Sequence, residues 1–337
     1  VFPGGKPSIG LAQQVYCEPG DEVIYPSPGF PIYESFIPYV RAVPVPLQLE
    51  ESANFTFSPE QLANLITPRT KLIYLNFPSN PTGGVAGKEL LEATAKVILE
   101  RCHPNVRVYS DEIYENIIFD GQQHRSISSV PEMAERTIIA GGFSKTYAWT
   151  GGRVGYAVFP SVKEADVFKT LNINYFSCVP PYNQEAAREA LENPLSKIAV
   201  KEMVQTFETR RNLIWQKINE IPGITCQKPG GAFYLFPNIS GVCENLGLIE
   251  KHQRLSKEQQ SSPDNIFQMF ALYEHQVAVL DRKSFGQIGA DGKYFLRLSI
   301  AADQAVLEEG VQRLKAASED LSGLDKFLKE RPDLIPA

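Results

Sequence analysis

Short apolar runs alternate along the chain with longer segments in which apolar positions recur at helical spacing. Five runs in the first half are rich in β-branched and aromatic residues and mostly lack polar alternation, as is typical of strands buried on both faces. These runs cover residues 22–25, 71–76, 106–110, 137–141 and 154–159. Buried strands with helices between them predict an α/β fold, in which helices cover a mostly parallel sheet.

The second half of the chain predicts a smaller lobe of mixed structure. A long amphipathic helix over residues 194–219, rich in Lys, Arg and Glu on one face, is expected to bridge two lobes. The other elements expected here are strands over 225–227, 232–236, 277–280 and 295–299, a closing helix over 304–318 and a helix in the tail 321–337. The polar stretch 241–264 indicates a surface loop or a short helical insertion. We therefore expect a large domain over residues 1–205 and a small α+β domain over 206–337.

Composition and charge exclude several classes of protein. Of the 337 residues, 43% are apolar and 21% are charged, which is typical of a folded soluble protein rather than a disordered one. The formal net charge of -6 offers no basic face of the kind that nucleic-acid-binding proteins usually present. We expect small-molecule ligands and no nucleic acid.

Cysteine usage and terminal sequence bear on the compartment. The five cysteines are odd in number, widely spaced and without a CxxC pair, which argues against both a disulfide framework and a zinc site. No apolar run approaches the ~20 residues of a membrane helix, and the first residues lack the features of a signal peptide. We expect a cytoplasmic protein with no metal and no membrane partner, and a chain that lacks its natural N-terminus because it has no initial methionine.

Polar residues follow three of the predicted strands, where open parallel sheets bind their ligands. Residues 71–76 are followed by Asn80-Pro81-Thr82-Gly83, residues 106–110 by Asp111-Glu112-Ile113-Tyr114, and residues 137–141 by Ser144-Lys145. Taken singly, each has an ordinary structural interpretation, as a turn, a helix cap or a solvated surface lysine. All three segments follow the end of a predicted strand, and this shared position favours a ligand-binding site there.

Together with further segments, these motifs resemble the class I aminotransferases of the fold-type-I pyridoxal-phosphate family, from Gly4 to about Ala301. Each motif is a weak pattern alone, but their order and spacing are specific. The segments that carry the resemblance are Gly4-Gly5-Lys6, Pro26-Ser27-Pro28-Gly29-Phe30, Asn80-Pro81-Thr82-Gly83, Asp111-Glu112-Ile113-Tyr114, Ser144-Lys145-Thr146-Tyr147, Thr150-Gly151-Gly152-Arg153-Val154-Gly155-Tyr156, Gly231-Ala232-Phe233-Tyr234 and Arg297-Leu298-Ser299.

The resemblance implies pyridoxal 5'-phosphate as cofactor and gives each residue a role. Lys145 would hold the cofactor as a Schiff base and, once released, carry the proton at the substrate α-carbon. Asp111 would pair with the protonated ring nitrogen, and Tyr114 and Asn80 would donate to the phenolic oxygen. Phe30 matches the aromatic position that stacks on the pyridine ring.

The resemblance also implies residues that bind the cofactor phosphate and residues that bind the substrate carboxylate. The cofactor phosphate would be held at the start of a helix over residues 8–16, where free N–H groups and the helix dipole favour an anion. The residues implied for it are Gly4, Gly5, Lys6, Ser144 and Arg153. Arg297 matches the arginine that takes the substrate α-carboxylate in a bidentate fork, and Asn80 would also contact substrate.

Two positions depart from the family pattern. Gly142 stands where many members carry a small hydroxyl residue, so one phosphate donor is missing. Gly152 stands where many carry Trp, which leaves space for another side chain to pack. Members also have an arm before the glycine-rich segment, so the chain is N-terminally truncated relative to them.

The function predicted is transfer of an amino group between an L-amino acid and a 2-oxo acid by a homodimer. Two alternatives stay open. Carbon–sulfur lyases and aminocyclopropane-carboxylate synthases use the same lysine, aspartate and arginines for other reactions. Some bacterial transcription regulators carry an aminotransferase-like effector domain, although here the full set of cofactor and substrate residues is retained.

Overall fold

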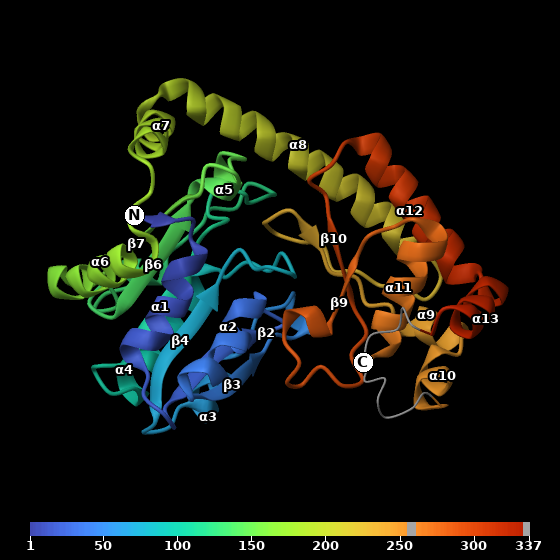
Figure 1. Ribbon diagram of the computed structural model, residues 1–337, viewed down its shortest axis with the longest axis horizontal. Coiled ribbons are helices and arrows are strands. Elements are labelled where there is room, and N and C mark those ends of the chain that lie inside the picture. The colour runs from blue at the N-terminus through green and yellow to red at the C-terminus, as the bar shows by residue number, and fades with distance from the viewer. Residues whose placement is uncertain (255–260, 333–337) are drawn as a thin grey trace. The chain divides into compact units, whose positions relative to one another are not determined.

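The computed structural model describes residues 1–254 and 261–332, which divide into two compact units (Figure 1). Unit 1 consists of Val1–Asn80, Gly84–Gln205 and Gly230–Ala232. Unit 2 consists of Pro81–Gly83, Thr206–Pro229 and Phe233–Ala337. The long helix predicted over 194–219 is present as α8 (Pro194–Asn219), and unit 1 gives way to unit 2 within it.

The described part of unit 1 is built on a seven-stranded sheet with the strand order β1-β7-β6-β5-β4-β2-β3. Strands β2 to β6 run parallel, whereas β7 pairs antiparallel with both β6 and β1. The strands are β1 (Phe2–Pro3), β2 (Glu22–Ser27), β3 (Val43–Gln48), β4 (Thr70–Asn76), β5 (Arg107–Asp111), β6 (Thr137–Gly142) and β7 (Val154–Val158). The α/β fold with a mostly parallel sheet is thus confirmed.

Helices surround this sheet, and α1 packs against it through the buried side chains of Ile9, Leu11 and Ala12. The same core contains Tyr33, Tyr74 and Tyr109, none of which has measurable exposure to solvent. The helices of unit 1 that precede α8 are α1 (Lys6–Tyr16), α2 (Pro31–Phe36), α3 (Pro59–Leu65), α4 (Lys88–Arg101), α5 (Phe143–Thr146), α6 (Val162–Phe176) and α7 (Pro181–Glu192).

Unit 2 contains a three-stranded antiparallel sheet with the order β8-β10-β9. The strands are β8 (Tyr234–Leu235), β9 (Leu280–Asp281) and β10 (Leu296–Ser299). The helices that follow α8 are α9 (Ser240–Asn245), α10 (Leu248–Arg254), α11 (Pro263–His275), α12 (Gln304–Glu319) and α13 (Leu321–Glu330). Residues 255–260 of the polar stretch and 333–337 of the predicted tail helix lie outside the described residues.

Three predicted strands of this unit are wrong or too long, and the backbone shows why. At 225–227, only Thr225 pairs, as an isolated bridge to Asn238, while the N–H of Cys226 donates to Oδ1 of Asn219 and its carbonyl accepts from Nε1 of Trp215, both on α8. The run 232–236 is reduced to β8 because Ala232 has a φ of 57°, which turns the chain. The run 277–280 pairs only from Leu280, because the Val277 N–H closes α11 by donating to Ala271.

The described part of the stretch 241–264 contains most of α9, all of α10 and the start of α11, which agrees with the helical one of its two predicted alternatives. None of the helices within residues 1–254 and 261–332 combines the length and the apolar character that crossing a membrane requires.

Candidate active site

The carboxyl ends of three neighbouring strands bring the predicted polar segments together. In the sheet register, Asp111 at the end of β5 lies beside Asn76 of β4 and Ala140 of β6. The Asn76 amide donates to the backbone carbonyl of Asp111 at 3.0 Å, and its Oδ1 accepts from the backbone N–H of Asn80 at 2.9 Å. Asn76, for which the sequence predicted no role, therefore fixes Asn80 to the strand end that carries Asp111.

The Asp111 carboxylate is buried and held at both oxygens. Oδ2 accepts from the Tyr33 hydroxyl at 2.7 Å, and Oδ1 accepts from the Ile113 N–H at 3.3 Å. The pKa of Asp111 is raised to about 6, chiefly by burial and to a smaller extent by the charge of the neighbouring Glu112. The two hydrogen bonds and the charge of Lys145 act in the opposite direction and lower this pKa. Asp111 is consequently ionised at neutral pH and protonated in mild acid.

Lys145 lies on α5, which begins directly after β6. Its Nζ is 5.7 Å from the centroid of the Tyr114 ring, and its charge acts on the Asp111 carboxylate. Tyr114 is buried, whereas Lys145 and the adjacent Ser144 are half-buried. An amine, a carboxylate and a phenol thus share one region of unit 1, at the edge where its parallel strands end.

The start of α1 and Arg153 form an anion-binding arrangement. A Cβ built on Gly4, whose φ is +88°, would lie 2.2 Å from Nη2 of Arg153, so the guanidinium covers the backbone there. Gly5 caps α1 without a side-chain hydrogen bond. The Arg153 side chain is exposed and donates to the carbonyls of Thr150 and Pro3, and within the described chain it has no acidic partner. Helix N–H groups beside an arginine suit a phosphate.

Phe30 and Lys6 lie together in the same unit. The Lys6 Nζ is 5.4 Å from the centroid of the Phe30 ring, and Phe30 meets Tyr33 edge-on at 5.9 Å. Tyr33 in turn contacts Asp111. The glycine-rich start of α1, the aromatic position and the aspartate are therefore linked through successive contacts.

The two departures from the family pattern have local explanations. A Cβ on Gly142 would lie 3.1 Å from both the Gly155 Cα and the Val154 carbonyl oxygen, so a larger residue would push β6 from β7. A Cβ on Gly152 would lie 2.1 Å from the Trp149 ring. Trp149 thus fills the space expected beside Gly152.

One cluster in the described chain has the spacing of metal ligands, namely Glu112, Glu115 and His124. Glu112 already accepts from the Ser126 hydroxyl at 2.6 Å and pairs with His124 at 2.8 Å. These bonds tie the end of β5 to the segment that holds Ser126. Glu112 and His124 are thus accounted for as part of a structural link between these segments.

Arg297 lies in unit 2, on β10, between two aromatic rings. Its guanidinium carbon is 4.4 Å from the centroid of Tyr234 and 4.8 Å from that of Phe285. The buried Arg282 side chain donates to the Gly286 carbonyl at 2.8 Å and so supports the turn that carries Phe285. Tyr234 lay in a recognised motif but had no predicted role, and no sequence signal indicated Phe285.

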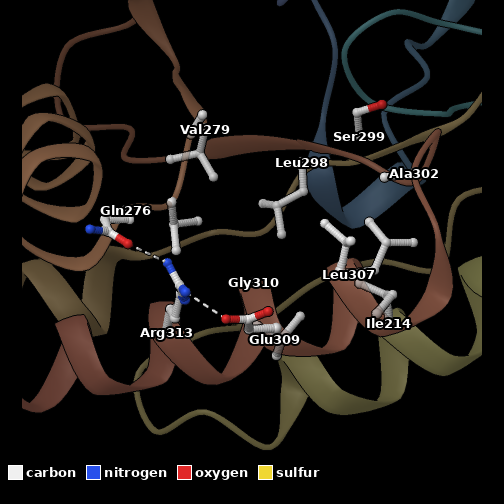
Figure 2. A pocket seen from close by; sticks show the side chains of 14 residues that line it. Ile214, Gln276, Val279, Leu298, Ser299, Ala302, Leu307, Glu309, Gly310 and Arg313 are labelled. Carbon is white, nitrogen blue, oxygen red and sulfur yellow. Dashed lines mark hydrogen bonds and ion pairs between the residues drawn. The ribbon is translucent and has the colours of Figure 1, made fainter.

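A hollow of about 380 Å³ in unit 2 is lined by side chains of α8, β10 and α12 and of the segment after α11 (Figure 2). Leu298 and Ser299 of β10 line it, whereas Arg297 does not. At one end, Arg313 donates to Gln276 at 3.0 Å and pairs with Glu309. None of the residues predicted for the site lines this hollow.

Comparisons with known proteins agree with this geometry. The profile of the family described as "Aminotransferase class I and II" matches residues 1–314. A probable aspartate/prephenate aminotransferase of Aquifex aeolicus is 36% identical over 322 residues, which cover 95% of this chain and 76% of that protein. An aspartate aminotransferase of Geobacillus stearothermophilus is 37% identical over 318 residues, covering 93% of this chain and 74% of that protein.

Solved structures give the same result. An aromatic aminotransferase from Pyrococcus horikoshii has a TM-score of 0.83 and 32% identity, covering 96% of this chain and 79% of that chain. An aspartate aminotransferase from Thermus thermophilus, solved with maleate, has a TM-score of 0.80 and 30% identity, covering 94% and 75% respectively.

Proposed function

Because this chain belongs to the class I and II aminotransferases, we propose that the residues gathered in unit 1 hold pyridoxal phosphate and that Arg297 holds the substrate. The chain is a pyridoxal-phosphate-dependent aminotransferase, whose substrates are small molecules, namely an amino acid and a 2-oxo acid. The buried carboxylate of Asp111, in one region with Lys145, is the observation that carries the assignment of roles.

The cofactor fits the donors present in unit 1. A Cβ on Gly4 would strike the Arg153 guanidinium, so this arginine lies against the start of α1, whose first N–H groups and whose Lys6 are available for a phosphate. Ser144, next to Lys145, is the further donor proposed for it. When bound, pyridoxal phosphate supplies an aldehyde that condenses with amines and a pyridine ring that withdraws electrons from the α-carbon.

Asp111 is the partner proposed for the protonated ring nitrogen. Its carboxylate is ionised above pH about 6 and buried, so its charge is little screened by water. Asn80, fixed by Asn76, and Tyr114 are the donors proposed for the phenolic oxygen. Phe30 offers an aromatic face for stacking against the ring.

Lys145 has two proposed tasks. Its amine holds the cofactor covalently in the resting enzyme. After an amino acid displaces it, Nζ takes the proton from the substrate α-carbon and returns a proton during the transfer.

Arg297 is proposed to bind the α-carboxylate that every amino and oxo acid substrate carries. A guanidinium held between the Tyr234 and Phe285 rings presents its N–H groups in a fixed plane, which matches a carboxylate fork. Asn80 is the second proposed substrate contact.

The activity is tested by supplying an L-amino acid and 2-oxoglutarate. We expect glutamate to form without ammonia, whereas a carbon–sulfur lyase would release ammonia and an oxo acid with no acceptor present. The donor panel begins with aspartate and the aromatic amino acids, the substrates named for the relatives. Ammonia release without glutamate would contradict transamination.

We propose a homodimer as the working form. Large apolar side chains are exposed along one stretch of unit 1, which favours an interface. They are Ile173, Tyr175, Phe176, Tyr182, Leu191, Leu195 and Ile198. Sedimentation tests this, and a double charge substitution, Tyr182→Glu with Leu195→Glu, should yield monomers.

A cytoplasmic location and a domain division are also proposed. All five cysteines are free thiols, four of them buried, which suits a reducing compartment. We propose residues 1–205 as the cofactor domain and 206–337 as the smaller C-terminal domain. The contact pattern supports a division near Gln205 and Thr206.

A further inference from the structure

Tyr33 contacts Asp111, the residue proposed to pair with the ring nitrogen of the cofactor. Its hydroxyl donates to Oδ2 of Asp111 at 2.7 Å. Tyr33 is completely buried and Asp111 is 8% exposed, so water competes little for this hydrogen bond. The two residues come from different elements, α2 and β5, and their contact is part of the tertiary fold.

The Tyr33 ring is fixed on several sides. It stacks on Tyr74 with the ring centroids 4.9 Å apart and the planes at 22°. The Tyr33 carbonyl accepts from Nε2 of Gln13 at 3.1 Å, and the Tyr74 hydroxyl donates to the Ile9 carbonyl at 2.8 Å. Both of these partners lie on α1, so the helix that starts at the proposed phosphate site also holds the tyrosine.

The chemistry of the pair sets the direction of its effect. Burial, followed by the nearby Asp111 charge, raises the pKa of Tyr33 well above its usual value, so its hydroxyl stays protonated and remains a donor. An ionised carboxylate only accepts hydrogen bonds, so a fixed donor favours the ionised form over the acid. This opposes the effect of burial, which favours the acid.

We propose that Tyr33 is a positioning residue for the reaction, whose hydroxyl orients the Asp111 carboxylate and keeps it ionised. The consequence for catalysis rests on the proposed function, in which Asp111 holds the protonated ring nitrogen. With Oδ2 held by Tyr33 and Oδ1 by the Ile113 N–H, the carboxylate plane is fixed, and lone pairs remain to accept one more donor.

Other charged or titratable groups around Asp111 do not replace this contact. Glu112 raises the pKa of Asp111 through its charge, and the charge of Lys145 lowers it. Tyr74 and Tyr109 lie close, but their hydroxyls are bonded elsewhere, to the Ile9 carbonyl and the Ser8 hydroxyl. Tyr33 is the side-chain donor that the described structure gives to this carboxylate.

The test compares Tyr33→Phe with Tyr74→Phe in the full chain without cofactor. Both variants delete one buried hydroxyl from the same cluster, but only the first removes a bond to Asp111. Carboxyl ¹³C NMR of aspartate-labelled protein, with Asp111→Asn to assign the signal, follows the titration of Asp111 directly. We expect Tyr33→Phe to move the midpoint upward by about one pH unit or more and Tyr74→Phe to leave it unchanged.

An unchanged midpoint in folded Tyr33→Phe would overturn the proposal. If that variant does not fold, site-specific 3-fluorotyrosine at position 33 keeps the ring and strengthens the donor. The Asp111 midpoint should then fall, and a midpoint that stays or rises would count against the role of Tyr33.

Kinetics of the enzyme with pyridoxal phosphate bound distinguish the role of Tyr33 from the proposed role of Asp111. Tyr33→Phe should lower kcat with little change in KM and should shift the acid limb of the pH profile upward, while Tyr74→Phe should not shift it. If Asp111→Asn retained full cofactor affinity and rate, the role of Asp111 would be wrong. The NMR titration would still decide whether Tyr33 controls its ionisation.

Discussion

The backbone of Gly4 touches the guanidinium of Arg153: a Cβ atom at Gly4 would lie 2.2 Å from Nη2. The two residues meet because β1 pairs with β7, which places Pro3 opposite Val154. An arginine is thereby held over the first N–H groups of α1, although Arg153 follows Pro3 by 150 positions in the chain.

Gly4→Ala is expected to displace Arg153 and to weaken cofactor binding about tenfold or more, with an added strain because Gly4 has a φ of +88°. Gly151→Ala is the matched control, since its Cβ would meet nothing within 4 Å. Fluorescence titration with pyridoxal phosphate measures both dissociation constants. Equal affinities of the two variants for pyridoxal phosphate would contradict the proposed phosphate site at Gly4 and Arg153.

Lys145→Ala should lose turnover by several orders of magnitude, because it removes both the covalent anchor and the group that moves the proton. Lys163→Ala, at an exposed position on α6, should remain active. Borohydride reduction of the loaded enzyme followed by peptide mapping locates the attachment point. A label on another lysine would end the assignment.

Phe285→Leu should raise KM for amino and oxo acids alike by roughly 2- to 30-fold, as expected for loss of one of two ring contacts on a guanidinium. Arg297→Lys should raise KM more, because it loses the planar fork. Phe327→Leu is the control, as this buried residue of unit 2 packs on Phe270 instead. Steady-state kinetics should show cofactor affinity unchanged in all three variants.

Asp111→Asn should stabilise the cofactor-free protein at neutral pH. Because the pKa of Asp111 rises from 3.8 to about 6 on folding, the folded state binds the proton more tightly than the unfolded state. The contribution of Asp111 to the free energy of unfolding therefore falls by up to about 3 kcal/mol as the pH rises from about 4 to about 6. It stays at this lower value at higher pH.

Asp111→Asn should lack this dependence of stability on pH. It should therefore unfold at a higher temperature than the parent protein at pH 7 but not at pH 4. Thermal unfolding from pH 4 to pH 8 measures the difference. Asp166→Asn, at an exposed position on α6, controls for the loss of one charge. A variant less stable than the parent at pH 7 would show that Asp111 is not a buried charge that opposes folding.

The sequence by itself determined the fold class, and it predicted where the polar residues of the candidate site would gather. Strands buried on both faces leave continuous apolar runs, and in a parallel sheet the residues after such runs converge at one edge, so the linear order predicted that Asp111 and Lys145 lie at the same edge. It did not indicate β3, whose Pro44 and Pro46 argue against a strand, because only the fold shows that β3 lies at the sheet edge.

The tertiary structure alone decided which side chains support the predicted ones. Tyr33 and Asp111 are 78 positions apart, and nothing in the local pattern of α2 indicates that its tyrosine contacts a carboxylate. Phe285 reaches Arg297 through a turn that Arg282 holds. Periodicity reports which face of an element is buried, whereas the partner of a buried polar group depends on which elements pack together.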